Sequence, residues 1–407
     1  MLKTFFFLIV VIFSLIILQF AVNTKYSFPE PQPFKGDYLY NPYKDMDLSK
    51  WKMANFHAHT RLYGGLTNGA ANTDQALDSY YRQFGYDIIN ISNYQNINTF
   101  ESGNRWYIPV YEHGYQYYKN HQIVLNAKRI RWLDYPFRQT LHNKQLVIDR
   151  LKRDTSVIVS IVHPVKRGAY SFSDLKYLAN YDCLEIASHE AVYTSYYDTI
   201  LSTGHPVFLL ADDDTHNMTG KNDACQSFNL IKADLDKSAI LHAIKTGCLV
   251  GVKLNRDSCL SDRKKISVLE NLPEITGINL NGDQLTVSLN KPVKSIRFIG
   301  QNGAEKKKII NTSGGSYLFG KQDTYIRTEI ECLNGAIYFL NPVFRYNGIN
   351  PDMPLPAPDI PKTWISRIII LFFILFIPAM GIRKQVYSWF KRQAGFRGAP
   401  EALIPES

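Results

Sequence analysis

Cysteine is scarce in this chain of 407 residues. There are five cysteines, an odd number, and no two of them form a CxxC pair. A thiolate zinc module and a disulfide-dense scaffold are therefore excluded, and at most two disulfides could form. Charged residues are also few, at 20% against 45% hydrophobic residues. This balance provides enough apolar side chains for folded cores and excludes a mainly disordered protein.

The sequence has no single basic face and no internal repeat. Its net charge of +10 comes from 46 lysines and arginines against 36 acidic residues, and much of the excess lies in short runs such as Lys306–Lys308 and in the C-terminal tail. Such scattered charge does not predict a nucleic-acid partner. A small-molecule or envelope-derived anionic substrate is the partner that we expect.

Both ends of the chain are apolar. Thr4–Val22 is about as long as a bilayer span, and no A-x-A cleavage pattern follows it, which favours an uncleaved anchor over a signal peptide. Trp364–Ile382 is followed at once by a basic tail, which is typical of the cytoplasmic side. A buried core helix is the alternative for this second stretch. We therefore expect a two-span protein of the cytoplasmic membrane, with the membrane as a partner and the main domains extracytoplasmic.

The chain between these ends changes character once. Residues 51–252 alternate short β-branched runs with helical stretches, which predicts parallel βαβ units in a barrel or a doubly wound sheet. Residues 272–346 contain several short strands and an Asn281-Gly282 turn, which is typical of a small β-sandwich. The predicted parts are an anchor at 1–24, a barrel at 25–265, a β-sandwich at 266–348, a proline-rich linker at 349–363, a transmembrane helix at 364–382 and a basic cytoplasmic tail at 383–407.

Residues that can bind metals gather at the predicted strand ends. His57 and His59 flank Ala58, and in an extended strand residues two apart project to the same face, so both imidazoles can address one ion. A single HxH pattern is more often structural. However, similar residues follow later strands, where active sites of α/β barrels are assembled. These residues are Glu112, His121, His163, Asp214 and His216.

Taken in order, these motifs resemble a known family. HAHT, IPVYEHG with the following His121, IVHP, and DTH followed by a helix ending in AIKTG look like the successive motifs of the polymerase and histidinol phosphatase (PHP) metallohydrolases. The resemblance covers about Trp51–Lys253. The segments YIRTEIE and YFLNPVFRY are similar to the domain that follows the barrel in the carbaryl-hydrolase-like branch.

This resemblance implies a fold, a cofactor and a reaction. The fold class would be α/β, with a distorted seven-stranded (β/α) barrel followed by a small β-sandwich, here flanked by transmembrane helices. The family carries up to three divalent ions, often zinc, manganese or iron, and commonly hydrolyses phosphate esters. Carried over by position, one ion would be held by His57, His59, Glu112 and Asp214. A second would be held by Glu112, His121 and His163.

The third metal site of the family is where this sequence departs from the pattern. Its positions fall on Gly64 and on Asn93-Tyr94, and only His216 remains as a ligand. We therefore expect two ions at most. The implied reaction is hydrolysis of a phosphoester by a metal-bridging hydroxide, with Glu112, His216 and Tyr94 as catalytic residues.

Several assignments stay open at this level. Lys166 and Arg167 follow IVHP and could bind an anionic substrate, or they could lie in a solvated loop. Asp213 could replace Asp214 as the ligand, and His189 could line the site or lie on the surface. The chain as a whole could hydrolyse an ester or carbamate, or it could be a degenerate relative that only binds metal or ligand. Arg327 and Asn341 are expected to serve folding.

Overall fold

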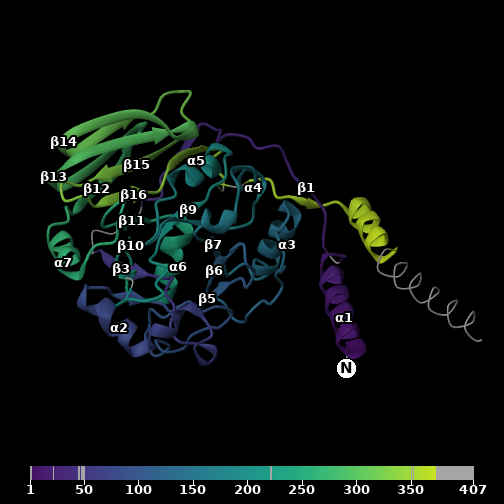
Figure 1. Cartoon of the computed structure of the whole chain (residues 1–407). Coiled ribbons are helices and arrows are strands. Elements are labelled where there is room, and N and C mark those ends of the chain that lie inside the picture. The colour runs from purple at the N-terminus through teal and green to yellow at the C-terminus, as the bar shows by residue number, and fades with distance from the viewer. Residues whose placement is uncertain are drawn as a thin grey trace, which may run out of the picture. The chain divides into compact units, whose positions relative to one another are not determined.

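The computed structural model describes residues 2–21, 23–44, 46, 51–220, 222–349, 351 and 353–372. The chain forms two compact units (Figure 1). The main unit is Phe28–Pro356, and the terminal unit combines Met1–Ser27 with Ala357–Ser407.

The terminal unit joins the two ends of the chain. It contains α1 (Leu2–Ala21) and a short antiparallel pair of β1 (Tyr26–Ser27) and β18 (Ala357–Pro358). The backbone N–H of Lys25 donates to Oγ1 of Thr363 at 2.9 Å. A helix covers residues 360–372, and the predicted basic tail lies outside the described residues.

The predicted transmembrane helices are wrong for the part of the chain that the structure describes. No helix there is both long enough and apolar enough to cross a membrane. Among the described residues, α1 covers Leu2–Ala21 and the C-terminal helix covers residues 360–372. The same finding contradicts the predicted location as a two-span membrane protein.

Seven short strands of the main unit are linked in a ring. β3 pairs in parallel with β4, and a five-stranded sheet has the order β5-β6-β7-β8-β9. Two isolated parallel bridges join these pieces, Tyr94 to Glu112 and Ala58 to Thr215. The strands are β3 (Lys52–Asn55), β4 (Ile88–Ile89), β5 (Val110–His113), β6 (Gln122–Leu125), β7 (Ile158–Ile161), β8 (Cys183–Ala187) and β9 (Phe208–Ala211).

Strand direction in this ring brings the chemical residues to one edge. β6 is antiparallel to both of its neighbours, while the other pairings are parallel. The carboxyl ends of the parallel strands therefore share an edge with the amino end of β6. This is why His121 precedes its strand, whereas His57, His163 and Asp214 follow theirs.

Helices alternate with the strands along the main unit, and capping residues fix where these helices begin and end. In α6, Oδ1 of Asp236 accepts from the backbone N–H groups of Ser238 and Ala239, and Gly247 ends the helix in the left-handed conformation at φ 75°. A Cβ on Gly247 would lie 2.3 Å from the ring of Phe208, so only glycine fits there. The helices of the main unit are α2 (Asp74–Gln83), α3 (Leu141–Leu151), α4 (Phe172–Tyr177), α5 (Thr194–Ser202), α6 (Lys237–Thr246) and α7 (Asp262–Glu270).

The strands of the predicted sandwich continue the sheet that contains β3. The path runs β12-β13-β15-β16-β11-β10-β3-β4, and β14 and β17 pair off it (Figure 1). The hairpin predicted at Asn281-Gly282 is confirmed, with Asn281 opposite Gln284. The strands are β2 (Tyr38–Tyr40), β10 (Ser227–Ile231), β11 (Leu249–Lys253), β12 (Ile275–Asn281), β13 (Gln284–Gly300), β14 (Ala304–Leu318), β15 (Tyr325–Glu331), β16 (Ile337–Leu340) and β17 (Val343–Tyr346). The predicted domain boundaries stay predictions.

Two buried polar residues join these strands to the ring, as expected for Arg327 and Asn341. Arg327 forms a two-point ion pair with Asp198 on α5, at 2.6 and 2.7 Å. Oδ1 of Asn341 accepts from the backbone N–H of Leu209 at 2.8 Å, and its amide donates to the carbonyl of Gly247 at 2.9 Å. These contacts satisfy groups that would otherwise be buried without a partner.

Candidate metal centre

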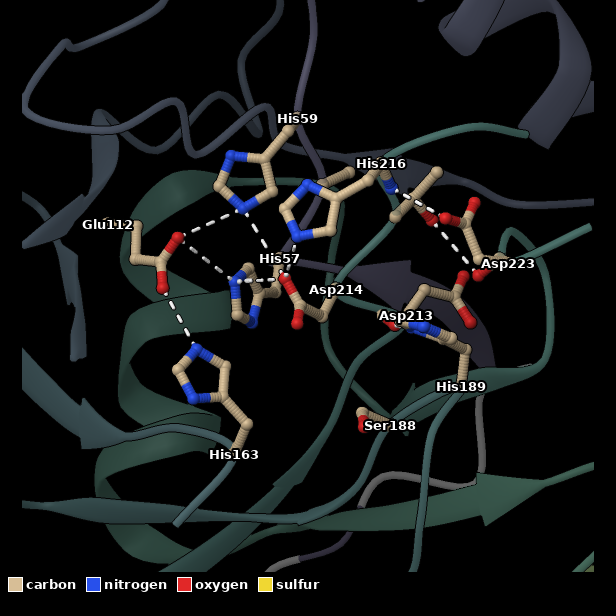
Figure 2. Close-up of polar contacts among 12 residues, drawn as sticks. His57, His59, Glu112, His163, Ser188, His189, Asp213, Asp214, His216 and Asp223 are labelled. Atoms are coloured by element: carbon tan, nitrogen blue, oxygen red, sulfur yellow. Dashed lines mark hydrogen bonds and ion pairs between the residues drawn. The ribbon is translucent and has the colours of Figure 1, made fainter. Parts of the chain in front are cut away.

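Four of the predicted ligands meet in one buried cluster, the first donor group: His57, His59, Glu112 and Asp214. Each is at most 1% exposed. Oε2 of Glu112 lies 3.6 Å from Nε2 of His57 and 3.0 Å from Nε2 of His59. Oδ1 of Asp214 lies 3.1 and 3.5 Å from the same two nitrogens (Figure 2).

These four atoms fit a metal ion better than they fit one another. None of them has a hydrogen-bond partner among the described residues, although all are buried. Ligand atoms at about 2.0 to 2.1 Å from a tetrahedral zinc lie about 3.3 Å apart, which matches the spacing of 3.0 to 3.6 Å. A bound cation would satisfy all four atoms at once.

The second donor group consists of Glu112, His121 and His163, also buried. Oε1 of Glu112 lies 2.5 Å from Nδ1 of His121 and 3.0 Å from Nε2 of His163. Glu112 thus presents one oxygen to each donor group. The structure therefore brings together all six predicted ligands, with Glu112 shared, while their role as ligands stays a prediction.

Backbone geometry aims two of these side chains inward. His163 and Asp214 adopt positive φ angles of 32° and 55° shortly after β7 and β9 end. Left-handed backbone is uncommon for residues other than glycine and tends to occur at functional sites. The N–H of Asp214 donates to the carbonyl of His57 at 3.0 Å, which ties the two ligand segments together.

Glu185 on β8 is a site residue that the sequence reasoning missed. Nδ1 of His57 donates to its Oε1 at 2.8 Å, and the backbone N–H of His163 donates to its Oε2 at 2.8 Å. A carboxylate on Nδ1 leaves Nε2 of His57 unprotonated and free for a metal. The available signal was an acidic residue inside the apolar strand CLEIA, which is fully buried.

Asp213 does not take part in either donor group. Its carboxylate accepts from the hydroxyl of Tyr81 and from three successive backbone N–H groups, those of Cys225, Gln226 and Ser227. Figure 2 shows its side chain turned away from Glu112. The structure therefore brings Asp214, and not Asp213, to the cluster.

The third-site positions are occupied by groups that are already engaged. Oδ1 of Asn93 accepts from the N–H of Thr60 at 2.8 Å, and its amide donates to Oγ1 of Thr60 at 2.9 Å. The ring of Tyr94 stacks on His59 with centroids 4.5 Å apart, and Gly64 has no side chain to offer. Only His216 keeps its place, with Nε2 at 3.2 Å from Oδ1 of Asp214.

A second missed residue holds His216 in place. The carboxylate of Asp223 accepts from the backbone N–H of His216 at 2.9 Å and from that of Asn217 (Figure 2). His216 also stacks on His59 with centroids 4.6 Å apart. Asp223 follows the DTH motif by several residues in a loop, and nothing in its sequence context indicated this contact.

The electrostatics of the cluster keep its carboxylates ionised. Burial alone would raise the pKa of Glu112, but the charge of His121 and the close contacts with His121, His163 and His57 bring that pKa well below its ordinary value. Burial also opposes ionisation of Asp214, whose pKa is nevertheless lowered by His216, His57 and Lys166. Burial would lower the pKa of His57, yet Asp214 and Glu112 raise it well above its ordinary value. The raised pKa means that His57 tends to hold a proton between these carboxylates, and a divalent ion can take the place of that proton.

The two predicted substrate-binding residues lie in different places. Nζ of Lys166 is 3.1 Å from Oδ2 of Asp214 and 2.9 Å from Oε1 of Glu190, so it lies at the cluster. Arg167 is exposed and stacks on the ring of Tyr117 at 4.4 Å. His189 contacts the carbonyl of Asp213 through Nδ1, and it reaches neither donor group.

Two of the solved structures that resemble the chain do so only weakly. No protein-family model and no curated protein sequence matches the chain. A two-domain protein from Bacteroides vulgatus, described as containing a predicted PHP-like metal-dependent phosphoesterase, has 13% identity and a TM-score of 0.40, over 82% of this chain and 99% of that one. PsfC from Pseudomonas syringae has 12% identity and a TM-score of 0.34, over 55% and 96% of the two chains.

These values are too low for either likeness to assign a function, and neither supports the carbaryl-hydrolase-like branch. The chemistry of the donor groups is more informative. Buried imidazole and carboxylate groups of this kind can hold divalent metal ions, and their number and spacing support a metal-dependent hydrolase.

Proposed function

We propose that the chain is a metal-dependent phosphoesterase that acts on a small anionic substrate. The observation that carries this proposal is the fully buried carboxylate of Glu112, whose two oxygens face two separate sets of ligand groups. A mixed imidazole and carboxylate set suits zinc, manganese or iron. Two ions held there would supply Lewis acids and a water of lowered pKa.

Three residues around the donor groups would handle the substrate. Burial alone would lower the pKa of Lys166, but Asp214 and Glu190 raise it, so the ammonium stays charged and can bind a phosphoryl oxygen. Burial, together with the charge of Glu112, raises the pKa of Tyr94 well above its ordinary value, so the phenol keeps its proton and can donate a hydrogen bond. His216, 8% exposed and with Nε2 at 3.2 Å from Oδ1 of Asp214, would pass a proton to a leaving oxygen.

A second candidate is a degenerate protein that binds metal or ligand without turnover. One specific observation favours it, because Tyr94 and Asn93 occupy the positions at which the resembled family has two further ligands. Hydrolysis of a neutral ester or carbamate gains no such support.

The two candidates are separated by a substrate panel. The full chain, loaded with zinc, manganese or iron, would be tested on chromogenic phosphate, carboxylate and carbamate esters. We expect phosphate esters to be hydrolysed, and His59→Ala or Asp214→Asn to slow turnover about a thousandfold or more, because the Lewis acid is lost. His242→Ala is the control, since His242 is exposed on α6. If the unaltered chain binds metal but hydrolyses none of the esters, and the ligand variants show the same lack of activity, the degenerate protein is favoured.

A further inference from the structure

A cavity of about 550 Å³ lies at the edge of the ring opposite the metal centre. Its wall includes Ala127, shortly after β6 ends, and Val157, directly before β7 begins. Because β6 and β7 are antiparallel, these two strand ends share one edge, and the other edge carries His121 and His163. The cavity is therefore separate from both donor groups.

Strand β5 connects the cavity and the metal centre without joining them. Neighbouring side chains of a strand point to opposite faces. Glu112 belongs to both donor groups, while Tyr111, the residue before it, lines the cavity. The hydroxyl of Tyr111 accepts from the backbone N–H of Arg131 at 3.1 Å. This contact fixes the segment that carries Arg131 against the ring, so the position of this part of the wall is set by the fold itself.

The wall of the cavity is strongly basic. Its one acidic residue among those described, Asp154, is already engaged, because its carboxylate lies 3.0 Å from Nζ of Lys128 and accepts from the hydroxyl of Ser156 at 2.6 Å. The other charged residues of the wall are arginines that form no ion pair with another described residue: Arg129, Arg131 and Arg153. Three positive charges therefore face one space without a neutralising group, and they repel one another.

This arrangement is more than a solvated surface. A cation after α3, such as Arg153, also suits the carboxyl end of a helix. Arg129 and Arg131 have no such reason for their position, because they lie in the loop between β6 and α3. Arg131 is also half-buried, so water screens its charge less than it screens a fully exposed one. Cations from two separate segments of the chain thus converge on one cavity, and such a field attracts anions.

The shape of the guanidinium group narrows the choice of anion. Its planar set of N–H donors matches phosphate oxygens in two-point hydrogen bonds, which a lysine ammonium does not form. Three such groups around 550 Å³ suit several phosphates better than one, because each additional phosphate reaches a further guanidinium.

We propose that this cavity binds a small polyanion with two or more phosphate groups, as in an oligophosphate chain. Arg131 holds one phosphate at the half-buried part of the wall, and Arg129 and Arg153 neutralise the others. The inference does not depend on the hydrolase proposal, since none of the proposed metal ligands lines the cavity.

The test measures binding of inorganic tripolyphosphate to the full chain by isothermal titration calorimetry. Tripolyphosphate should bind at least about tenfold more tightly than orthophosphate, because the single phosphate cannot reach all three guanidinium groups. The double variant Arg131→Gln with Arg153→Gln should weaken tripolyphosphate about tenfold or more. Arg263→Gln is the matched control, since Arg263 is exposed on α7 and does not line the cavity, and it should leave the affinity unchanged.

A variant of the metal centre shows where the anion binds. Asp214→Asn should retain the binding of tripolyphosphate, because Asp214 does not line the cavity. Loss of binding in Asp214→Asn, with binding kept in the arginine double variant, would place the anion at the metal centre and overturn the inference.

Two results on the unaltered chain would also overturn the inference, and they do not depend on the variants folding. One is equal affinity for tripolyphosphate and orthophosphate. The other is binding of a single-stranded oligonucleotide without binding of tripolyphosphate, which would indicate a nucleic-acid surface instead of a site for a small anion.

Discussion

Nδ1 of His57 donates a hydrogen bond of 2.8 Å to Oε1 of Glu185, and both side chains are fully buried. This contact turns Nε2 of His57 toward Glu112 and Asp214. The other oxygen of Glu185 accepts from the backbone of His163, so one carboxylate positions a residue of each donor group.

Glu185→Gln is therefore expected to weaken metal binding without unfolding the chain. The amide cannot accept both hydrogen bonds, and it lacks the charge that makes His57 a better ligand. Loss of such a supporting carboxylate typically costs ten- to a hundredfold in metal affinity. Competition titration with a metal chelator measures this affinity. Glu305→Gln, on the exposed strand β14, is the control, and equal affinities in the two variants would contradict a positioning role.

Lys166 and Arg167 should differ although they are neighbours. Lys166 contacts Asp214, whereas Arg167 lies on Tyr117. Lys166→Met should raise the KM of anionic substrates more than it lowers kcat, because a charge that holds ground state and transition state equally acts on binding. Arg167→Met should leave both constants near those of the unaltered chain. Steady-state kinetics measure KM and kcat of both variants. Equal effects of the two changes would contradict the prediction that only Lys166 binds the substrate.

Tyr94 should limit the number of ions. Its ring covers His59, so a double variant that combines Asn93→Asp with Tyr94→His should bind a third, weaker ion through the carboxylate and imidazole it gains. Tyr94→Phe keeps the ring and should add none. Elemental analysis after dialysis against metal-containing buffer gives the count. An unchanged count in the double variant would mean that another group closes this position.

His205 should make the fold sensitive to acid. It is buried, and burial lowers its pKa from 6.5 to about 3. The folded state thus favours the neutral ring, so stability is complete above pH 6.5 and falls as the pH drops from 6.5 toward 3, by up to about 5 kcal/mol. His205→Phe keeps the ring contact with Tyr181 and should flatten this part of the pH profile. Urea unfolding at several pH values measures it, and parallel profiles would contradict the assignment.

Much of the site could be anticipated because its residues follow local rules. His57 and His59 lie two apart at a strand end, and His163 and Asp214 end apolar runs, so each marks the same edge of the ring. The supporting residues carry no such mark. Glu185 is one acidic residue within an apolar strand, and its contact with His57 joins positions 128 residues apart.

The sequence predicted the fold less well where the contacts join residues that are far apart along the chain. The alternation of strands and helices indicated the mixed α/β character, but not that β16 would pair with β11 and extend the sheet, with Leu340 opposite Val250. Apolar composition at both ends suggested membrane spans, and the described helices do not meet that requirement.

The central claim is that Glu112 is shared by two metal sites, and the metal content of the full chain tests it most directly. Elemental analysis should find close to two divalent ions per chain. Glu112→Gln should lower the content at both sites, to below one ion, because one donor group receives an amide nitrogen in place of an oxygen and the other keeps only an uncharged carbonyl oxygen, while circular dichroism shows that the fold is kept. A chain that binds no divalent ion, or a Glu112→Gln variant that still holds two, would contradict the account.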